Sequence, residues 1–153
     1  MKIEDLGEVT DVVFHHSMSA PATTKRETIE RWHREKGWSR IGYHYVIESD
    51  PVVIRRCPPV AELGIHVANG NHGRIGVCVV GDNRFPEKRW SPTQVHAAVW
   101  LLSLLRRVYP GIGFGGHRDY DPDRTCPEID VRWLFEVAGH PVDLPRQNFG
   151  LED

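Results

Sequence analysis

The order of apolar and polar positions predicts a chain that alternates between strands and helices. Five segments have the composition of strands: residues 11–17, 41–49, 52–56, 73–82 and 112–116. The fourth of these, GRIGVCVVGD, is almost wholly apolar, as expected for a central strand that is covered on both faces. A turn at Asp50-Pro51 joins the second and third segments, which predicts a β-hairpin.

Three further segments have the pattern of helices: residues 24–38, 91–110 and 129–139. The first begins with Thr24 and Glu27 at capping-box spacing. The second has Ser91 as its N-cap, Pro92 at the first helical position and Gln94 completing a capping box. Loose alternation of these elements, with one hairpin, predicts an α/β fold: a single three-layer domain with a central mixed β-sheet flanked by helices.

Length favours one domain across residues 1–153, with its core at about 11–138 and a polar, peripheral C-terminal tail at 139–153. The formal net charge of −2 gives no reason to expect a nucleic-acid partner, which would usually show as a basic excess. We expect a monomer.

Neither a signal peptide nor a membrane span is expected. The N-terminal stretch MKIEDLGEVTDVVF has acidic residues where a signal peptide needs a basic region followed by an apolar run. The longest apolar-rich stretch, VHAAVWLLSLL, is too short to cross a bilayer. We therefore expect a soluble protein that is made in the cytoplasm, and any action outside the cell would require release by other means.

The polar loop GGHRDYDPDRTCPE contains two good ligands for a soft metal, His117 and Cys126. One further ligand is expected at the end of the first strand, from either His15 or His16. Both cannot easily reach one ion, because neighbouring strand residues point to opposite faces. Two histidines and one cysteine leave a fourth position open to water, which is the arrangement of catalytic zinc sites. The alternative is a histidine packed against the sheet and a buried loop cysteine.

Five blocks occur in an order that resembles a known family: VVFHHS, RWHREKGWSRIGYHYVIE, GIHVANGNHGRIGVCVVGD, SPTQ and GGHRDYDPDRTCP. They resemble the zinc-dependent N-acetylmuramoyl-L-alanine amidases of type 2, which include the small phage amidases called lysozymes. Animal peptidoglycan recognition proteins share their fold. The resemblance runs from about Asp11 to Phe135. It implies that His15, rather than His16, binds Zn²⁺ together with His117 and Cys126.

The resemblance also implies roles beside the metal. Tyr43 matches a tyrosine next to the zinc and is expected to donate to the oxyanion or to the metal-bound water. Arg124 stands where coliphage-type enzymes have a lysine; since a guanidinium stays charged, we assign it to stabilising an oxyanion or carboxylate. Proton transfer is left to Tyr43 or the zinc water. His66 and Asn71 match residues of the substrate groove.

Each of these assignments has a structural alternative: a tyrosine packed on the sheet, a solvated arginine and a loop histidine without a function. Other reactive or aromatic residues are assigned to the structure. Trp32, Trp38 and Trp100 are expected in the core rather than on a sugar. Cys78 is expected to be a core thiol and Cys57 a loop thiol.

The implied function is zinc-dependent hydrolysis of the amide bond between N-acetylmuramic acid and L-alanine in peptidoglycan, by a phage or prophage endolysin that reaches the cell wall after release. One alternative is a protein on the same fold that binds muropeptides without cleaving them; the presence of Tyr43 and Cys126 weighs against it. A cytosolic amidase that recycles muropeptides is another. A structural zinc protein would need a fourth protein ligand.

Overall fold

The computed structural model describes residues 5–57, 62–68, 70–138 and 149–151. These residues contain five strands and three α-helices. The strands are β1 (Asp11–His16), β2 (Tyr45–Ile47), β3 (Ile54–Arg56), β4 (Arg74–Val79) and β5 (Gly113–Gly116). The helices are α1 (Arg26–Glu35), α2 (Pro92–Val108) and α3 (Val131–Ala138), with short 3₁₀ turns at Pro86–Lys88 and His117–Asp119.

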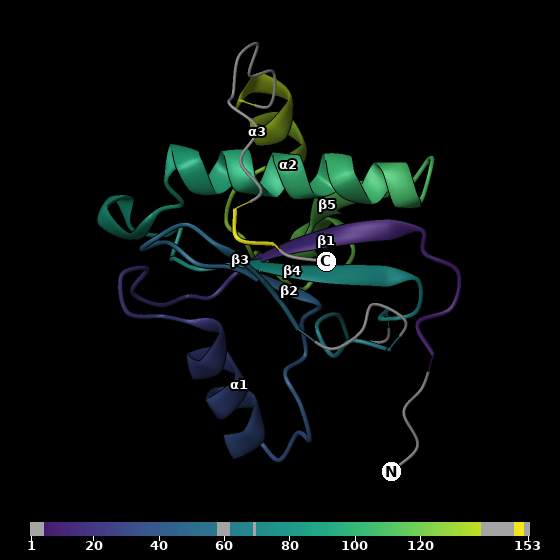
Figure 1. Ribbon diagram of the computed structural model, residues 1–153, viewed down its shortest axis with the longest axis horizontal. Helices are drawn as coiled ribbons and strands as arrows, with labels where there is room; N and C mark the ends of the chain where they lie inside the picture. The colour runs from purple at the N-terminus through teal and green to yellow at the C-terminus, as the bar shows by residue number, and fades with distance from the viewer. Residues whose placement is uncertain (1–4, 58–61, 69, 139–148, 152–153) are drawn as a thin grey trace.

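The strands form one mixed sheet in the order β3-β2-β4-β1-β5 (Figure 1). Strand β1 runs parallel to both of its neighbours, β4 and β5, and β2 runs parallel to β4. Only β3 is antiparallel, and its pairing with β2 is the predicted hairpin. In this register Phe14 lies beside Val77 on one side and Gly116 on the other.

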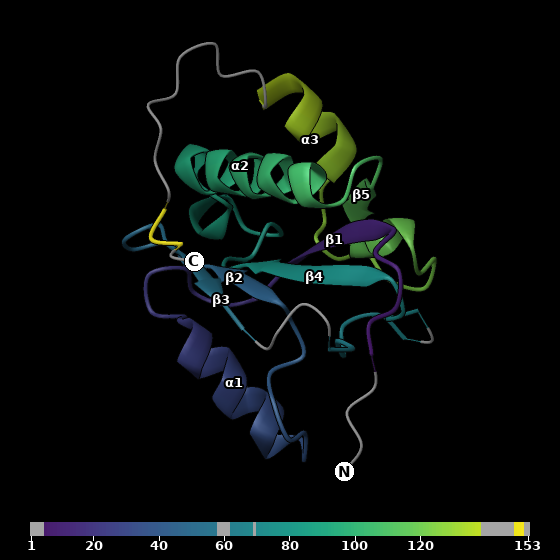
Figure 2. The ribbon, with the colours of Figure 1, turned by 45° about the vertical axis from the view of Figure 1, so that its right-hand side comes forward.

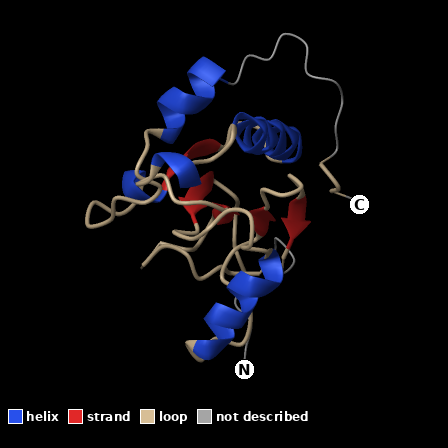
Figure 3. Ribbon diagram, turned by 90° about the vertical axis from the view of Figure 1, so that its left-hand side faces the viewer, coloured by secondary structure: helices blue, strands red, loops and turns tan. Residues whose placement is uncertain are grey.

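Helices cover both faces of the sheet, so the predicted three-layer architecture is confirmed (Figures 1 and 3). Helices α2 and α3 lie on one face, and α1 lies on the other (Figure 2). Val12 and Phe14 belong to the large apolar core under α2 and α3, where the Phe14 ring meets Phe135 at a centroid distance of 4.8 Å. Because side chains alternate along a strand, Val13 and His15 face the α1 side.

Helix α2 begins as its sequence predicts. The backbone N–H of Gln94 donates to Ser91 Oγ at 3.1 Å, and the Ser91 N–H donates to Gln94 Oε1 at 2.9 Å. The buried Gln94 amide also donates to the Val80 carbonyl at 2.9 Å, which ties the start of α2 to the end of β4. Neither α2 nor another helix of the described residues has the length and apolar character needed to cross a membrane.

The start of α1 differs from the prediction. The capping box expected at Thr24 does not form, because the Thr24 hydroxyl donates to the Ala20 carbonyl at 2.7 Å in the preceding turn. Only half of a capping box forms one residue later: the Lys25 N–H donates to Thr28 Oγ1 at 3.1 Å, and the helix begins at Arg26. The lysine side chain has no acceptor that could return the second bond. A contact of the hydroxyl with the preceding turn thus overrides the capping-box spacing.

Part of the predicted peripheral tail packs against the core. The Phe149 carbonyl accepts a hydrogen bond from the Ile54 N–H at 2.8 Å. The ring centroids of Phe149 and Trp100 are 5.8 Å apart. Leu151 is buried. Residues 139–148 and 152–153 of that tail lie outside the described residues.

Candidate metal centre

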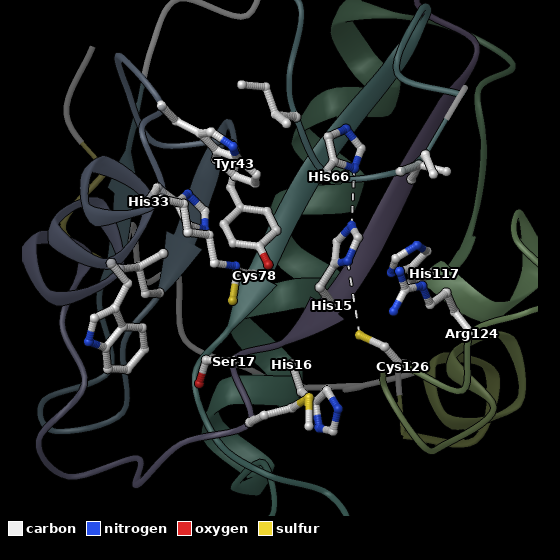
Figure 4. Close-up of a pocket in the computed structure, with 18 of the residues that line it drawn as sticks. His15, His16, Ser17, His33, Tyr43, His66, Cys78, His117, Arg124 and Cys126 are labelled. Carbon is white, nitrogen blue, oxygen red and sulfur yellow. Dashed lines mark hydrogen bonds between the residues drawn. The ribbon is translucent and has the colours of Figure 1, made fainter.

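A pocket of about 700 Å³ opens on the α1 side of the sheet, above the carboxyl ends of β1, β4 and β5 (Figure 4). All seven residues to which the sequence assigned a site role line it: His15, Tyr43, His66, Asn71, His117, Arg124 and Cys126. Ligand sites at the carboxyl ends of parallel strands are a general property of α/β sheets.

The sheet register brings the two candidate histidine ligands together. Parallel pairing places Phe14 beside Gly116, so the residues that follow them, His15 and His117, leave the sheet side by side. Their ring centroids are 4.7 Å apart. Two side chains from distant parts of the sequence therefore meet because β1 and β5 are neighbours.

Cys126 completes a group of three donors. One ligand atom each of His15, His117 and Cys126 lies within 4.8 Å of the other two, and no other such group occurs in the described residues. His15 Nδ1 lies 4.0 Å from Cys126 Sγ, slightly longer than the roughly 3.5 Å between ligands on a tetrahedral zinc ion. His117 Nε2 is buried and has no hydrogen-bond partner within the described residues. Donor types, spacing and this unpartnered nitrogen fit a zinc ion.

Burial sets the protonation states of this group. It lowers the pKa of His15 well below its ordinary value, and the nearby His66 and His117 lower it further. Burial likewise lowers the pKa of His117, so both rings are neutral at pH 7, the form that binds a metal. Burial raises the pKa of the Cys126 thiol to about 12, although the backbone N–H of His16 donates to its sulfur. A thiolate here therefore requires the positive charge of a metal ion.

His16 lies outside the ligand group. Its Nδ1 accepts a hydrogen bond from the Asn83 N–H at 3.1 Å and lies 4.0 Å from Asp82 Oδ1. Asn83 in turn donates through its side chain to the Pro127 carbonyl at 3.0 Å. This contact anchors the loop that presents Cys126 to the end of the sheet.

Tyr43 lies just before β2, with its ring centroid 5.2 Å from that of His15. Its hydroxyl contacts the thiol of Cys78 on the floor of the pocket (Figure 4). Burial raises the pKa of Tyr43 well above its ordinary value, so the phenol keeps its proton and acts as a donor. Cys78 is fully buried, as expected of a core thiol, and also lines the pocket.

Arg124 lies at the open edge of the pocket, with 63% of its side chain exposed. Its Nε is 3.9 Å from Asp121 Oδ2, and the same carboxylate oxygen lies 3.9 Å from His117 Nε2. Asp121 therefore lies between the guanidinium and one of the candidate ligands.

The polar groups of His66 and Asn71 contact the protein itself. His66 Nδ1 lies 3.0 Å from His15 Nε2, and its Nε2 lies 3.1 Å from the Arg74 carbonyl. Asn71 Oδ1 accepts hydrogen bonds from the backbone N–H groups of His66 and Val67, at 2.9 and 2.8 Å. Burial lowers the pKa of His66 to about 3.

Sequence reasoning missed three pocket residues on and after α1. Trp32 and Trp38, expected in the core, line the pocket together with His33. The His33 ring lies 4.5 Å from that of Trp38, and its Nδ1 accepts the Gly42 N–H at 2.9 Å. Nothing in the local sequence distinguished the wall of a pocket from a core.

Known proteins resemble this chain in sequence and in structure. The family model described as N-acetylmuramoyl-L-alanine amidase matches residues 5–129. The endolysin of Escherichia phage T7 is 35% identical over 135 residues, covering 84% of this chain and 87% of that protein. The endolysin of Klebsiella phage KP32 is 36% identical over 133 residues, covering 83% and 86%.

Solved structures share the fold. The N-acetylmuramoyl-L-alanine amidase LysC from Clostridium intestinale superposes with a TM-score of 0.77 at 25% identity, covering 93% of this chain and 90% of that one. Wild-type Drosophila PGRP-LB superposes with a TM-score of 0.72 at 26% identity, covering 92% and 86%. The chain belongs to the N-acetylmuramoyl-L-alanine amidase family, enzymes that cleave the amide bond between N-acetylmuramic acid and L-alanine in peptidoglycan.

Proposed function

We propose that this amidase depends on a zinc ion held by His15, His117 and Cys126. The observation that carries the proposal is the convergence of these three donors, from β1 and from the loop after β5, at one end of the pocket. Two neutral imidazoles and one thiolate leave a net charge of about +1 and an open fourth position. A zinc ion bound there would lower the pKa of a coordinated water and polarise the scissile carbonyl.

Tyr43 is proposed as the donor to the oxygen of the scissile amide. Its phenol remains protonated because it is buried, and its ring packs beside His15. In this role the hydroxyl would leave its contact with Cys78 when a substrate carbonyl enters the pocket. A preorganised donor of this kind stabilises negative charge that develops in the transition state.

Arg124 is proposed to stabilise negative charge from the open side of the pocket. Its guanidinium is permanently protonated, so it contributes an electrostatic interaction and no proton transfer. Because the side chain is largely exposed, a substrate must cover it before the charge acts at full strength. Proton transfer to the leaving amine is then assigned to the water that attacks.

We propose peptidoglycan or its muropeptides as the substrate and an endolysin as the biological role. Support comes from the phage endolysins that match more than four fifths of the chain. The lining of the pocket includes the candidate metal ligands and also Trp38 after α1, which leaves room for parts of a substrate beyond the scissile bond. His66 and Asn71 also line it.

The decisive experiment measures metal content and release of N-terminal alanine from purified murein, for the wild type and for Cys126→Ser. The variant should lose bound zinc and lose activity by a factor on the order of 10³ or more, since a metal contributes several kcal/mol to such a reaction. Cys57→Ser is the matched control: burial raises the pKa of Cys57 to about 12, like that of Cys126, but Cys57 does not line the pocket.

Three outcomes would contradict the proposal in different ways. Release of reducing sugar ends in place of alanine would reject the bond assignment. Binding of muropeptides by zinc-loaded protein without hydrolysis would favour a recognition protein. Full activity of Cys126→Ser after exhaustive chelation would reject the metal centre itself.

A further inference from the structure

The imidazole of His66 is fixed against the sheet by its surroundings. A Cβ placed at Gly76 of β4 would lie 2.7 Å from two carbons of the ring, and a Cβ at Gly64 would lie 2.7 Å from one of them. Only glycine leaves room at these two positions. The backbone of the His66 loop is also held, because the side-chain oxygen of Asn71 accepts the N–H groups of His66 and Val67.

The hydrogen bonds of His66 determine where its proton lies. A carbonyl oxygen only accepts, so His66 Nε2, at 3.1 Å from the Arg74 carbonyl, must carry the hydrogen. In the neutral ring Nδ1 is then an acceptor. Its partner at 3.0 Å is Nε2 of His15, which must therefore be the donor.

The same reasoning fixes the tautomer of His15. With its hydrogen on Nε2, His15 has a free lone pair on Nδ1, and this nitrogen faces Cys126 Sγ at 4.0 Å (Figure 4). Nδ1 is thus the atom that His15 offers to the ligand group. Hydrogen bonding of the second nitrogen of a ligating histidine is the usual way to fix its tautomer and ring orientation.

We propose that His66 is a positioning residue, which holds His15 in the tautomer and orientation that bind the metal ion, in a chain from the Arg74 carbonyl through both rings. This rests on the proposed function, since it concerns the same metal centre. Both ring nitrogens of His66 are engaged within the protein. A hydrogen bond to substrate would require one of these contacts to break, which argues against the role expected from the sequence.

Two variants of equal shape separate positioning from substrate contact. His66→Asn puts a side-chain oxygen near the place of Nδ1 and keeps an acceptor for His15. His66→Leu has nearly the same shape and no acceptor. The zinc affinity of the metal-free proteins is measured by competition with a chromophoric chelator, and ¹⁵N NMR of the imidazoles reports the His15 tautomer without metal.

The wild type and His66→Asn should show His15 protonated on Nε2 and should bind zinc with similar affinity. His66→Leu should bind zinc about 10- to 100-fold more weakly, with His15 shifted toward the other tautomer. Circular dichroism and thermal unfolding check that both variants fold.

A His66→Leu variant with wild-type zinc affinity and only a raised KM would overturn the proposal in favour of substrate contact. Should neither variant fold, the metal-free wild type still decides, because His15 protonated on Nδ1 would contradict the positioning role. If the wild type shows the expected tautomer but binds no zinc, the proposed function fails while the chain of hydrogen bonds stands.

Discussion

The candidate metal centre has two sides that differ in how they are held. The strand side consists of His15, Tyr43 and His66, and the loop side consists of His117, Arg124 and Cys126. On the strand side, His15 is only 2% exposed and hydrogen-bonds to a second ring that is itself anchored on the backbone. On the loop side, Arg124 is largely exposed, and His117 Nε2 has no hydrogen-bond partner among the described residues.

This difference indicates a division of labour. The strand side is preorganised by the fold, since His15 is held by His66 and His66 by the Arg74 carbonyl. The loop side is fastened to the sheet end by the hydrogen bond from the Asn83 side chain to the Pro127 carbonyl. Substitutions on the strand side should therefore change the chemistry at the metal, whereas those on the loop side should change charge and access.

Apart from the candidate metal ligands, the largest effect is expected from Tyr43→Phe. The phenyl ring keeps the packing beside His15 but removes the donor, so kcat for alanine release should fall about 10²- to 10³-fold with zinc content unchanged. Tyr45→Phe, in the apolar core on the other face, is the control and should retain activity. An unchanged kcat for Tyr43→Phe would reduce Tyr43 to a packing residue.

A smaller effect is expected from Arg124→Ala on the loop side. Loss of one exposed positive charge should lower kcat/KM about 10- to 100-fold, and the difference from the wild type should shrink as salt is added. Arg124→Lys keeps the charge and should stay close to the wild type. Arg118→Ala, an exposed arginine of the same loop that does not line the pocket, is the matched control.

Equal losses for Arg124→Ala and Arg118→Ala would mean that the loop responds to net charge alone. A loss for Arg124→Lys as large as that for Arg124→Ala would show that the planar guanidinium, rather than its charge, is what the substrate requires.

The smallest effect concerns the stability of the folded protein in acid. Burial lowers the pKa of His33, which packs behind Tyr43, to about 4. The unfolded chain takes up this proton near pH 6.5 and the folded chain only near pH 4. The stabilisation that neutral His33 contributes to the folded state is therefore complete above pH 6.5 and is lost as the pH falls toward 4.

Urea unfolding of the metal-free protein at pH 7 and pH 5 tests this expectation. His33→Gln keeps an acceptor for the Gly42 N–H. From pH 7 to pH 5 its free energy of unfolding should fall by up to about 2 kcal/mol less than that of the wild type. Between pH 7 and pH 8 the two proteins should change in parallel. Identical losses from pH 7 to pH 5 would mean that His33 is protonated in the folded protein.

The sequence predicted those features that depend on local chemistry. The capping box at Ser91 formed because its two partners lie within one turn and no competing contact reaches them. The box at Thr24 failed because Ala20, outside the helix, captured the hydroxyl. Capping-box spacing is therefore reliable only where no neighbouring backbone group takes up the capping hydroxyl.

The sequence predicted seven of the residues that line the pocket, but not the hydrogen bonds that connect them. Alternation along β1 showed that one of His15 and His16 must face away, but only the family pattern selected His15. The bond between His66 and His15 was invisible, because it depends on how a loop returns over β4. The same is true of Trp38, whose place on the pocket wall is set by the end of α1.

The parallel pairing of β1 with β5 has a consequence for protein synthesis. His15 leaves the ribosome first, and its neighbouring strand β5 follows much later in the chain, together with His117 and Cys126. A nascent or truncated product that stops before Gly113 has an unpaired sheet edge and one donor of three. The cell that makes this hydrolase thus carries all three candidate donors only once translation has passed Cys126.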